Sequence, residues 1–218
     1  MKQWHFTVIA LVLIGAAFTL AAVFYDTQHG DQASQQISQN RDALIREHSV
    51  RAGDPQAKVT IVEFLDPACE TCGKFHPLVK RLLDQYGGKV NLVVRYAPLH
   101  QGSDQMVALL EAAKVQGQFW PVLELMFETQ SRWAINHAAQ PEIFWSILAQ
   151  AQTGLDMAKL QQDMQHPAVI KAIQQDVADG QMLGATKTPT FFVNGKPLPS
   201  FGYEQLANLV KSEVAVSY

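Results

Sequence analysis

The pattern of apolar and polar positions is most regular in the central part of the chain. Residues 58–65 form an apolar run rich in β-branched side chains, which predicts a buried strand. Residues 69–86 carry apolar side chains at helical spacing, and the pair Gly87-Gly88 ends that predicted helix. Residues 90–96 form a second β-branched run. Strand, helix and strand in this order predict a βαβ unit whose two strands are parallel.

Helical spacing then dominates residues 103–183, which we interpret as a helical insertion subdomain. Its large aromatic side chains either line a peptide groove or fill a core, and a core is the more usual place for them. These side chains are Trp120, Phe127, Trp133 and Trp145. After a first helix that begins near Ser103, helices are predicted at residues 119–130, 141–152, 155–164 and 167–183.

The strand pattern returns near the end of the chain. Residues 190–193 form a short apolar run, and Asn194-Gly195 is a typical two-residue hairpin turn. The partner strand begins at Lys196, and residues 203–214 have the pattern of a closing helix. Together with the βαβ unit, these elements predict an α/β fold whose sheet is interrupted by the helical region.

An uncharged apolar segment covers residues 6–25. About twenty such residues in a helix can cross the hydrocarbon core of a bilayer. Lys2 precedes the segment and Asp26 follows it, so the charge bias places the rest of the chain outside the cytoplasm. A cleaved signal peptide is the alternative, but its apolar core would be shorter and would end in a small-x-small site. We interpret residues 1–25 as a membrane anchor or signal segment and favour a single transmembrane helix.

Residues 26–56 are predominantly polar and predict a linker that is partly helical around residues 38–48. The segment is either a spacer between the membrane and the folded domain or an oligomerising stalk. We prefer the spacer, because a coiled coil needs several heptads and this segment has room for about two. The folded domain is predicted over residues 57–218.

Composition narrows the class of protein. The chain has 218 residues, of which 48% are hydrophobic and 17% charged, and this composition is typical of a packed globular protein. Its formal net charge of −3 gives no reason to expect a nucleic-acid partner. Two cysteines are too few for a disulfide scaffold, so a reactive role is favoured over a structural one.

Both cysteines lie at the start of the helix predicted after the first strand. Cys69 and Cys72 have the spacing C-x-x-C, which places both sulfur atoms on one helix face. The partial positive charge and free N–H groups of a helix N-terminus favour a thiolate, which is the form that attacks disulfides. The pair therefore predicts a redox-active disulfide, with Cys69 as the exposed nucleophile and Cys72 as the more buried resolving cysteine.

The order of elements, with C-x-x-C at the first helix and a helical insertion before the hairpin, resembles the thioredoxin fold of the DsbA family. Two further motifs strengthen the resemblance. Residues 186–195, TKTPTFFVNG, are similar to the family's segment around its cis-proline, and Glu63 is similar to its acidic strand residue. The resemblance covers residues 57–214 and implies an extracytoplasmic protein thiol–disulfide oxidoreductase.

By this resemblance, Pro189 follows a cis peptide bond and, with Thr188, holds an extended substrate. An ordinary trans proline that opens an edge strand is the alternative, and we favour cis because the cysteines are present. The resemblance also implies that Glu63 is buried near Cys72 and moves the proton of that resolving cysteine with a carboxyl group of raised pKa. A surface position on the strand is the alternative for Glu63.

The dipeptide between the cysteines, Glu70-Thr71, differs from the common pattern of the family, in which proline comes first. We expect both residues, with Thr188, to contact the substrate. A carboxylate beside Cys69 should raise the pKa of that thiol, and a less stable thiolate makes the couple less oxidising. Thr188 also resembles the isomerase and reductase members, so the direction of exchange stays open among oxidase, isomerase and reductase.

Two other functions stay open. Cys69, Cys72 and His76 share one helix face and would supply three ligands of a periplasmic metal-binding or metal-delivery protein, although a structural zinc site needs a fourth ligand. A pure peptide-binding module is the other function. Asp66 and His100 border the predicted site without an assigned role.

The sequence as a whole thus predicts a membrane-anchored enzyme, a protein thiol–disulfide oxidoreductase with its catalytic domain in the periplasm or another extracytoplasmic space. The expected partners are protein or peptide substrates with thiols or disulfides, and a redox partner protein that the sequence does not name. The two sulfur atoms carry the chemistry, so no organic cofactor and no metal is implied.

Overall fold

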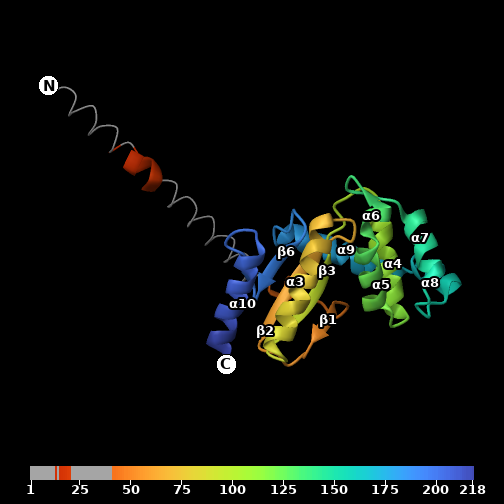
Figure 1. Ribbon diagram of the computed structural model, residues 1–218, viewed down its shortest axis with the longest axis horizontal. Coiled ribbons are helices and arrows are strands. Elements are labelled where there is room, and N and C mark those ends of the chain that lie inside the picture. Colours follow the sequence, from red (N-terminus) through yellow and green to blue (C-terminus); the bar gives the residue numbers. More distant parts are fainter. Residues whose placement is uncertain (1–12, 14, 21–40) are drawn as a thin grey trace, which may run out of the picture.

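The computed structural model describes residue 13, residues 15–20 and residues 41–218 (Figure 1). Most of the predicted transmembrane helix over residues 6–25, and the linker residues 26–40, lie outside the described residues. Within the part of the chain that is described, no helix combines the length and the apolar character that a membrane span requires.

The folded part is built on a five-stranded mixed sheet with the strand order β1–β3–β2–β6–β7. β2 (Val59–Leu65) and β3 (Val90–Tyr96) are parallel neighbours, which confirms the predicted βαβ unit. β6 (Thr190–Val193) pairs with β2 in antiparallel orientation and turns into β7 (Lys196–Pro197), the predicted hairpin. β1 (Val50–Gly53) forms the other edge, antiparallel to β3.

The two faces of the sheet bury alternate residues of β2. Ile61 lies on the face covered by α3 (Glu70–Tyr86) and α10 (Tyr203–Ser217), in the main apolar cluster. Val62 lies on the opposite face, in a second and smaller cluster. Side chains alternate along a strand, so Glu63 shares the face of Ile61 and points toward α3, the helix that carries the cysteines.

The helical insertion between β3 and β6 is present and lies beside the sheet in Figure 1. Trp133 fills its core, fully buried, and donates from its indole N–H to the carbonyl oxygen of Met126 at 3.0 Å. The other three large aromatic residues pack against this core and are partly buried, as expected for core-forming side chains. The insertion comprises α4 (Ser103–Val115), α5 (Phe119–Glu128), α6 (Gln130–Trp133), α7 (Pro141–Gln150), α8 (Met157–Asp163) and α9 (Pro167–Met182).

A small hairpin in the insertion is absent from the sequence prediction. β4 (Ala134–Ile135) and β5 (Ala138–Ala139) pair in antiparallel orientation. The turn residues Asn136 and His137 have φ values of 51° and 61°, as a two-residue turn of the primed type requires. Strands of two residues are too short to show an alternating pattern, so the sequence signal reduces to the single turn residue Asn136.

The polar segment ahead of β1 is fixed to the domain by buried charges. The fully buried Arg95 of β3 forms ion pairs with Asp176 and Asp179 of α9, at 2.7 and 2.6 Å. From the polar segment, Arg46 pairs with Asp179 at 2.7 Å and His48 pairs with Asp176 at 2.6 Å. Elements ahead of residue 57, the predicted start of the domain, therefore pack on it.

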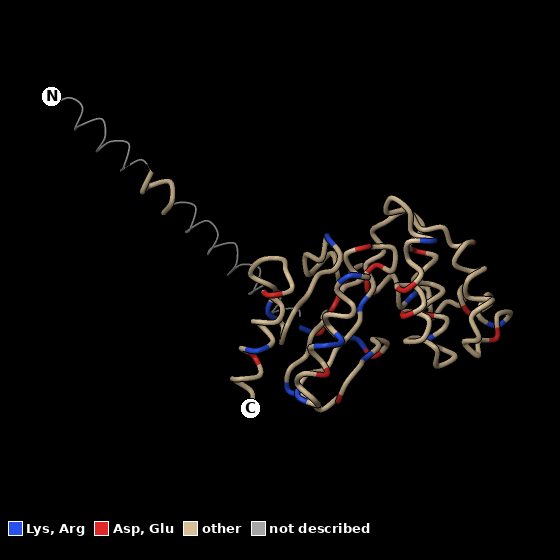
Figure 2. Tube along the Cα trace, in the orientation of Figure 1, with Lys and Arg blue, Asp and Glu red and all other residues tan. Residues whose placement is uncertain are grey.

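α2 (Arg41–Leu44) opens this packed segment, and its residues Ala43 and Leu44 are buried in the smaller apolar cluster. Apart from the buried cluster around Arg95, charged residues of both signs are interspersed along the described trace (Figure 2). The contact between this segment and α9 is made by charged residues of opposite sign.

Candidate active site

The active-site turn follows β2 directly and is held by Asp66. Cys69 is the N-cap residue of α3, and its N–H donates to the carbonyl oxygen of Asp66 at 3.0 Å. The buried carboxylate of Asp66 accepts from the N–H of Ala68 at 2.8 Å and hydrogen-bonds to the side chains of His100 and Ser103, each at 2.6 Å. Asp66 and His100 thus tie the turn before the cysteines to the loop after β3.

Both cysteines are reduced and lie at the start of α3. Cys72 is fully buried, and Cys69 is only 4% exposed, so the prediction of an exposed nucleophile is wrong. The reason is the segment before β6, which packs against Cys69 and leaves its Sγ 3.2 Å from the carbonyl oxygen of Thr188. The Thr188–Pro189 peptide bond is cis, as predicted.

The pKa of Cys69 is lowered from 9.0 to about 5. The largest cause is a hydrogen bond from the thiol of Cys72, and the side chain of Thr188 and the backbone at Cys72 and Thr71 add further hydrogen bonds. Burial opposes them and is outweighed. The expectation that Glu70 would raise this pKa is wrong, because donors in direct contact with the sulfur decide the outcome and Glu70 is not among the causes.

The carboxyl group of Glu63 is buried on β2, so its alternative position on the surface is excluded. Burial raises its pKa from 4.5 to about 8, and the negative charge of the Cys69 thiolate adds to the rise. Burial also raises the pKa of Cys72 well above 9.0, with smaller contributions from the hydrogen bond to Cys69 and the charge of Glu63. The site therefore combines a thiol of low pKa, a thiol of high pKa and a carboxyl group that titrates near neutral pH.

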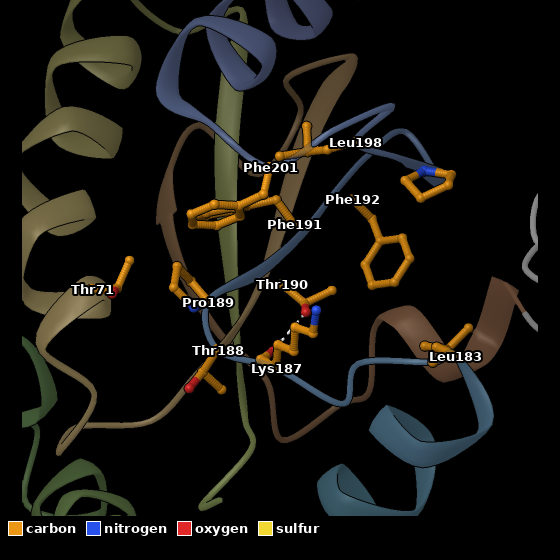
Figure 3. Close-up of a pocket in the computed structure, with 12 residues that line it drawn as sticks. Thr71, Leu183, Lys187, Thr188, Pro189, Thr190, Phe191, Phe192, Leu198 and Phe201 are labelled. Carbon is orange, nitrogen blue, oxygen red and sulfur yellow. Dashed lines mark hydrogen bonds between the residues drawn. The ribbon is translucent and has the colours of Figure 1, made fainter. Parts of the chain in front are cut away.

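An apolar groove of about 420 Å³ lies next to the cis-proline (Figure 3). Thr71 and Thr188 both line the groove, which brings two of the three predicted substrate contacts together. Glu70 is not among the lining residues. On the far side, Phe201 is 59% exposed and packs against Phe75 of α3, with ring centroids 5.0 Å apart. The groove therefore offers an accessible apolar surface that begins beside the reacting cysteine.

Sequence reasoning did not single out Leu198 and Phe201 as groove residues. Figure 3 shows both beside Phe191, where the chain passes from β7 toward α10. The available signal is two large apolar side chains in a connecting segment, where polar residues are the rule. The sequence alone does not indicate that this segment folds back over the start of β6.

His76 lies apart from the groove. Its ring packs against Phe127, with centroids 5.0 Å apart, and its Nε2 atom lies 3.7 Å from Oε1 of Glu124. Burial lowers the pKa of His76. Among the residues that the structure describes, no three His, Cys, Asp or Glu side chains are grouped as metal ligands, so Cys69, Cys72 and His76 do not form a ligand set.

A family model described as thioredoxin matches residues 46–212 of the chain. The chain belongs to the thioredoxin family. The matched region includes both cysteines, Glu63 and the cis-proline, together with the helical insertion.

Solved structures agree with this membership. A thioredoxin-like oxidoreductase from Silicibacter pomeroyi is 28% identical to this thioredoxin-family chain, with a TM-score of 0.68 over 82% of the chain and 99% of its own length. The thiol–disulfide exchange protein alpha-DsbA2 from Wolbachia pipientis is 19% identical and shares the fold, with a TM-score of 0.64 over 88% of this chain and 98% of its own. The predicted thioredoxin-like fold is confirmed, and the 28% identical oxidoreductase agrees with the predicted enzyme class.

A curated relative is a much longer protein. The Na(+)/H(+) antiporter NhaA from Herminiimonas arsenicoxydans is 35% identical to this thioredoxin-family chain over 146 residues. These residues are 67% of the chain but 22% of the antiporter, so the chain spans about a fifth of the length of that relative. The shared region is one segment of the antiporter.

Proposed function

We propose that this thioredoxin-family chain is a protein thiol–disulfide oxidoreductase that works through the Cys69–Cys72 couple. The observation that carries the proposal is the difference between the two thiols: the pKa of Cys69 is lowered to about 5 and that of Cys72 is raised well above 9.0. Disulfide exchange needs one sulfur that attacks or leaves readily as a thiolate. It also needs a second sulfur that stays protonated until the mixed disulfide has formed.

In the oxidising direction, a substrate thiolate attacks Sγ of Cys69 in the Cys69–Cys72 disulfide. The bond between the two cysteines breaks, Cys72 leaves and takes up a proton, and the substrate is joined to Cys69 by a mixed disulfide. A second substrate thiolate then attacks the substrate sulfur, and Cys69 leaves as a stable thiolate. The substrate has lost two electrons to the cysteine pair, and the reducing direction is the reverse of these steps.

We assign proton transfer at Cys72 to Glu63. A general acid or base works best when its pKa lies near the operating pH, and the pKa of Glu63 is raised to about 8. Part of that rise comes from the Cys69 thiolate, whose charge is absent in the mixed disulfide. Glu63 therefore ionises more readily at the step in which Cys72 must lose its proton to resolve the mixed disulfide.

We propose that the substrate binds as an extended peptide beside Thr188 and Pro189. A substrate peptide that pairs with Thr188 would lie at the reacting sulfur, because the carbonyl oxygen of Thr188 lies 3.2 Å from Sγ of Cys69. Apolar side chains that flank a substrate cysteine fit the groove lined by Thr71, Phe191 and Phe201. The preferred substrates are therefore proteins or peptides in which apolar residues surround the exchanging cysteine.

The low pKa of Cys69 favours oxidase or isomerase activity over reductase activity. A stable thiolate stabilises the reduced pair, and a stable reduced pair makes the disulfide form more oxidising. Turnover as an oxidase then needs a redox partner protein that accepts the two electrons.

We further propose that residues 6–25 anchor the chain in a membrane, with the polar segment that follows as a spacer and the folded domain in an extracytoplasmic space. The support is the uncharged apolar sequence of this segment and its flanking charges. Such a compartment lets a cysteine pair be oxidised and used. Extraction of cell membranes with alkaline carbonate tests the anchor, since an integral anchor keeps the chain in the membrane fraction.

The enzymatic proposal is tested with the full chain purified in detergent and a reduced, unfolded substrate protein. The oxidised enzyme should transfer its disulfide to the substrate in stoichiometric amount, and Cys69→Ser and Cys72→Ser should both abolish the transfer. Ser217→Ala, at the far end of α10, serves as the control variant. Equimolar zinc or copper that survives desalting, together with no disulfide transfer, would favour the metal-binding alternative. Full activity of Cys69→Ser in cells would favour the peptide-binding module.

A further inference from the structure

Gln130, the first residue of α6, connects the helical insertion to the active-site turn. Its side chain is buried, and the residue is 8% exposed. The amide nitrogen Nε2 donates to the carbonyl oxygen of Pro67 at 2.7 Å and to the carbonyl oxygen of Cys69 at 3.0 Å. A side-chain amide has two N–H donors, so both donors of Gln130 bind the turn that carries the reacting cysteine.

Gly73 of α3 makes room for this amide. A Cβ atom at position 73 would lie 2.6 Å from Oε1 and 3.3 Å from Cδ of Gln130. Gly73 lies inside a regular helix, where glycine costs about 1 kcal/mol relative to alanine, and it is not among the glycines with positive φ. The close approach of Gln130, rather than backbone conformation, therefore explains a glycine one residue after Cys72.

We propose that Gln130 is a positioning residue for thiol–disulfide exchange, which holds the backbone on both sides of Ala68 so that the sulfur of Cys69 faces Cys72 and Thr188. The inference rests on the proposed function and extends it to a residue of the insertion. Without the amide, the carbonyl groups of Pro67 and Cys69 lose a shared donor. The Cys69 carbonyl then keeps the N–H of Gly73 as a donor, at 3.2 Å, and the turn keeps its hydrogen bonds to Asp66.

The first test is the variant Gln130→Met, which keeps the length of the side chain and removes both donors. A looser turn weakens the hydrogen bonds to the Cys69 sulfur, so the pKa of Cys69 should rise by about one, which lowers the rate of alkylation at pH 5 about fivefold. The equilibrium of the enzyme with glutathione should shift toward the disulfide form. Gln162→Met, at an exposed position on α8, is the matched control and should change neither quantity.

The second test is a double-mutant cycle with Gly73→Ala. In the wild-type background the new methyl group displaces the amide, so the variant should raise the pKa of Cys69 much as Gln130→Met does. In a Gln130→Ala background the space is free and Gly73→Ala should have little further effect on that pKa. Equal effects of Gly73→Ala in both backgrounds would overturn the proposed link between the two residues.

The two proposals fail in different ways. If the wild-type enzyme exchanges disulfides but Gln130→Met leaves the alkylation profile and the glutathione equilibrium unchanged, the positioning role is wrong and the proposed function stands. A lower unfolding temperature with an unchanged pKa has the same meaning, since it assigns Gln130 to stability alone. If the wild-type enzyme forms no reversible disulfide, the proposed function is wrong, and the alkylation profile still tests whether Gln130 positions the sulfur.

Discussion

The buried carboxyl group of Glu63 on β2 and the sulfur of Cys69 at the start of α3 are electrostatically coupled. Burial is the larger cause of the raised pKa of Glu63, and the charge of the Cys69 thiolate is the second. When the disulfide or a mixed disulfide forms, Cys69 carries no charge and that second contribution is lost. The redox state of the cysteine pair therefore alters the ionisation of a buried acid on the neighbouring strand.

The first prediction concerns Glu63→Gln and stability. The pKa of Glu63 rises from 4.5 in the unfolded chain to about 8 in the folded one, so the folded state resists ionisation of this group. The resulting penalty is absent below pH 4.5 and grows until the pH passes 8. At pH 7 the reduced variant should be more stable than the wild type by about 3 kcal/mol, and near pH 4 the two should be equal.

Urea denaturation of the reduced proteins at both pH values measures this difference. Glu204→Gln, at an exposed position on α10, is the control and should leave the pH dependence as it is in the wild type. A gain in stability of the same size at pH 4 and pH 7 would contradict the assignment, because a gain without pH dependence does not come from ionisation. The variant should also resolve mixed disulfides more slowly than the wild type, since it lacks the proton acceptor for Cys72.

The second prediction concerns the pH dependence of Cys69. The rate of alkylation of the reduced protein should follow a titration with a midpoint near pH 5, because the thiolate is the reactive form. Cys72→Ala removes the hydrogen bond that is the largest cause of the lowered pKa. We expect the midpoint to rise by about one or more in that variant. A midpoint near pH 9 in the wild type would show that the thiolate is not stabilised.

The third prediction is the reduction potential of the couple. The pKa of Cys69, about 5, lies between the values of about 7 for thioredoxin and about 3.5 for DsbA. Those two proteins have potentials of about −270 and −120 mV, and a tenfold change in thiolate stability corresponds to about 30 mV. Scaled from either reference at pH 7, the expected potential lies between about −220 and −160 mV.

Equilibration with glutathione buffers measures this potential. A value near −270 mV would indicate a reductase. It would mean that another contribution destabilises the reduced form and cancels the stabilisation of the Cys69 thiolate. A value near −120 mV would mark a strong disulfide donor. Between them, the predicted range is suited to an enzyme that both donates and rearranges disulfides.

Local signals in the sequence were sufficient for the fold and for the reacting groups. β2, α3 and β3 were predicted from the spacing of their apolar residues and from the glycine pair that ends α3. The helical insertion was predicted from its long stretch of helical spacing. The cysteine pair lies in a short motif. These features depend on neighbours in the chain, and for that reason one sequence is enough to place them. The cis-proline was instead implied by the resemblance of residues 186–195 to the DsbA family.

Contacts between residues far apart in the chain could not be predicted from these local signals. The pKa of Cys69 is set by Cys72 and Thr188, and Thr188 lies 119 residues away in the chain. From the sequence, the helix N-terminus was expected to favour the thiolate and Glu70 to oppose it, and only the expectation for Glu70 was wrong. The contact with Thr188 could not be predicted from neighbouring residues. The edge strand β1 was missed for a similar reason, since Val50 and Ala52 are partly buried only because β3 and the main apolar cluster lie beside them.

The fourth prediction concerns the buried charges that hold the polar segment ahead of β1. Arg95→Met leaves the carboxylates of Asp176 and Asp179 without their fully buried partner, and such a change costs about 3–5 kcal/mol. Arg46→Met removes a partner that is 32% exposed, so we expect a loss of about 1 kcal/mol. Urea denaturation at pH 7 tests this order, and equal losses in the two variants would contradict it.

The fifth prediction separates substrate binding from redox chemistry through Phe201. This side chain lines the groove and is 59% exposed, so Phe201→Ala should change the free energy of unfolding by less than about 1 kcal/mol. It makes no hydrogen bond to the sulfur atoms, so the reduction potential and the rate of exchange with glutathione should stay unchanged. For a peptide with apolar residues beside its cysteine, the loss of apolar contact should lower kcat/KM about tenfold.

The comparison of two substrates makes this prediction specific. Glutathione is small and reports on Cys69 alone, whereas the peptide also needs the groove. Val216→Ala, at a position 83% exposed near the end of α10, controls for the loss of an exposed apolar side chain elsewhere. If Phe201→Ala slows both substrates equally, Phe201 acts on the reactive sulfur through its contact with Phe75 in α3. If it slows neither, peptides do not use this groove, and substrate recognition lies on another surface around Cys69.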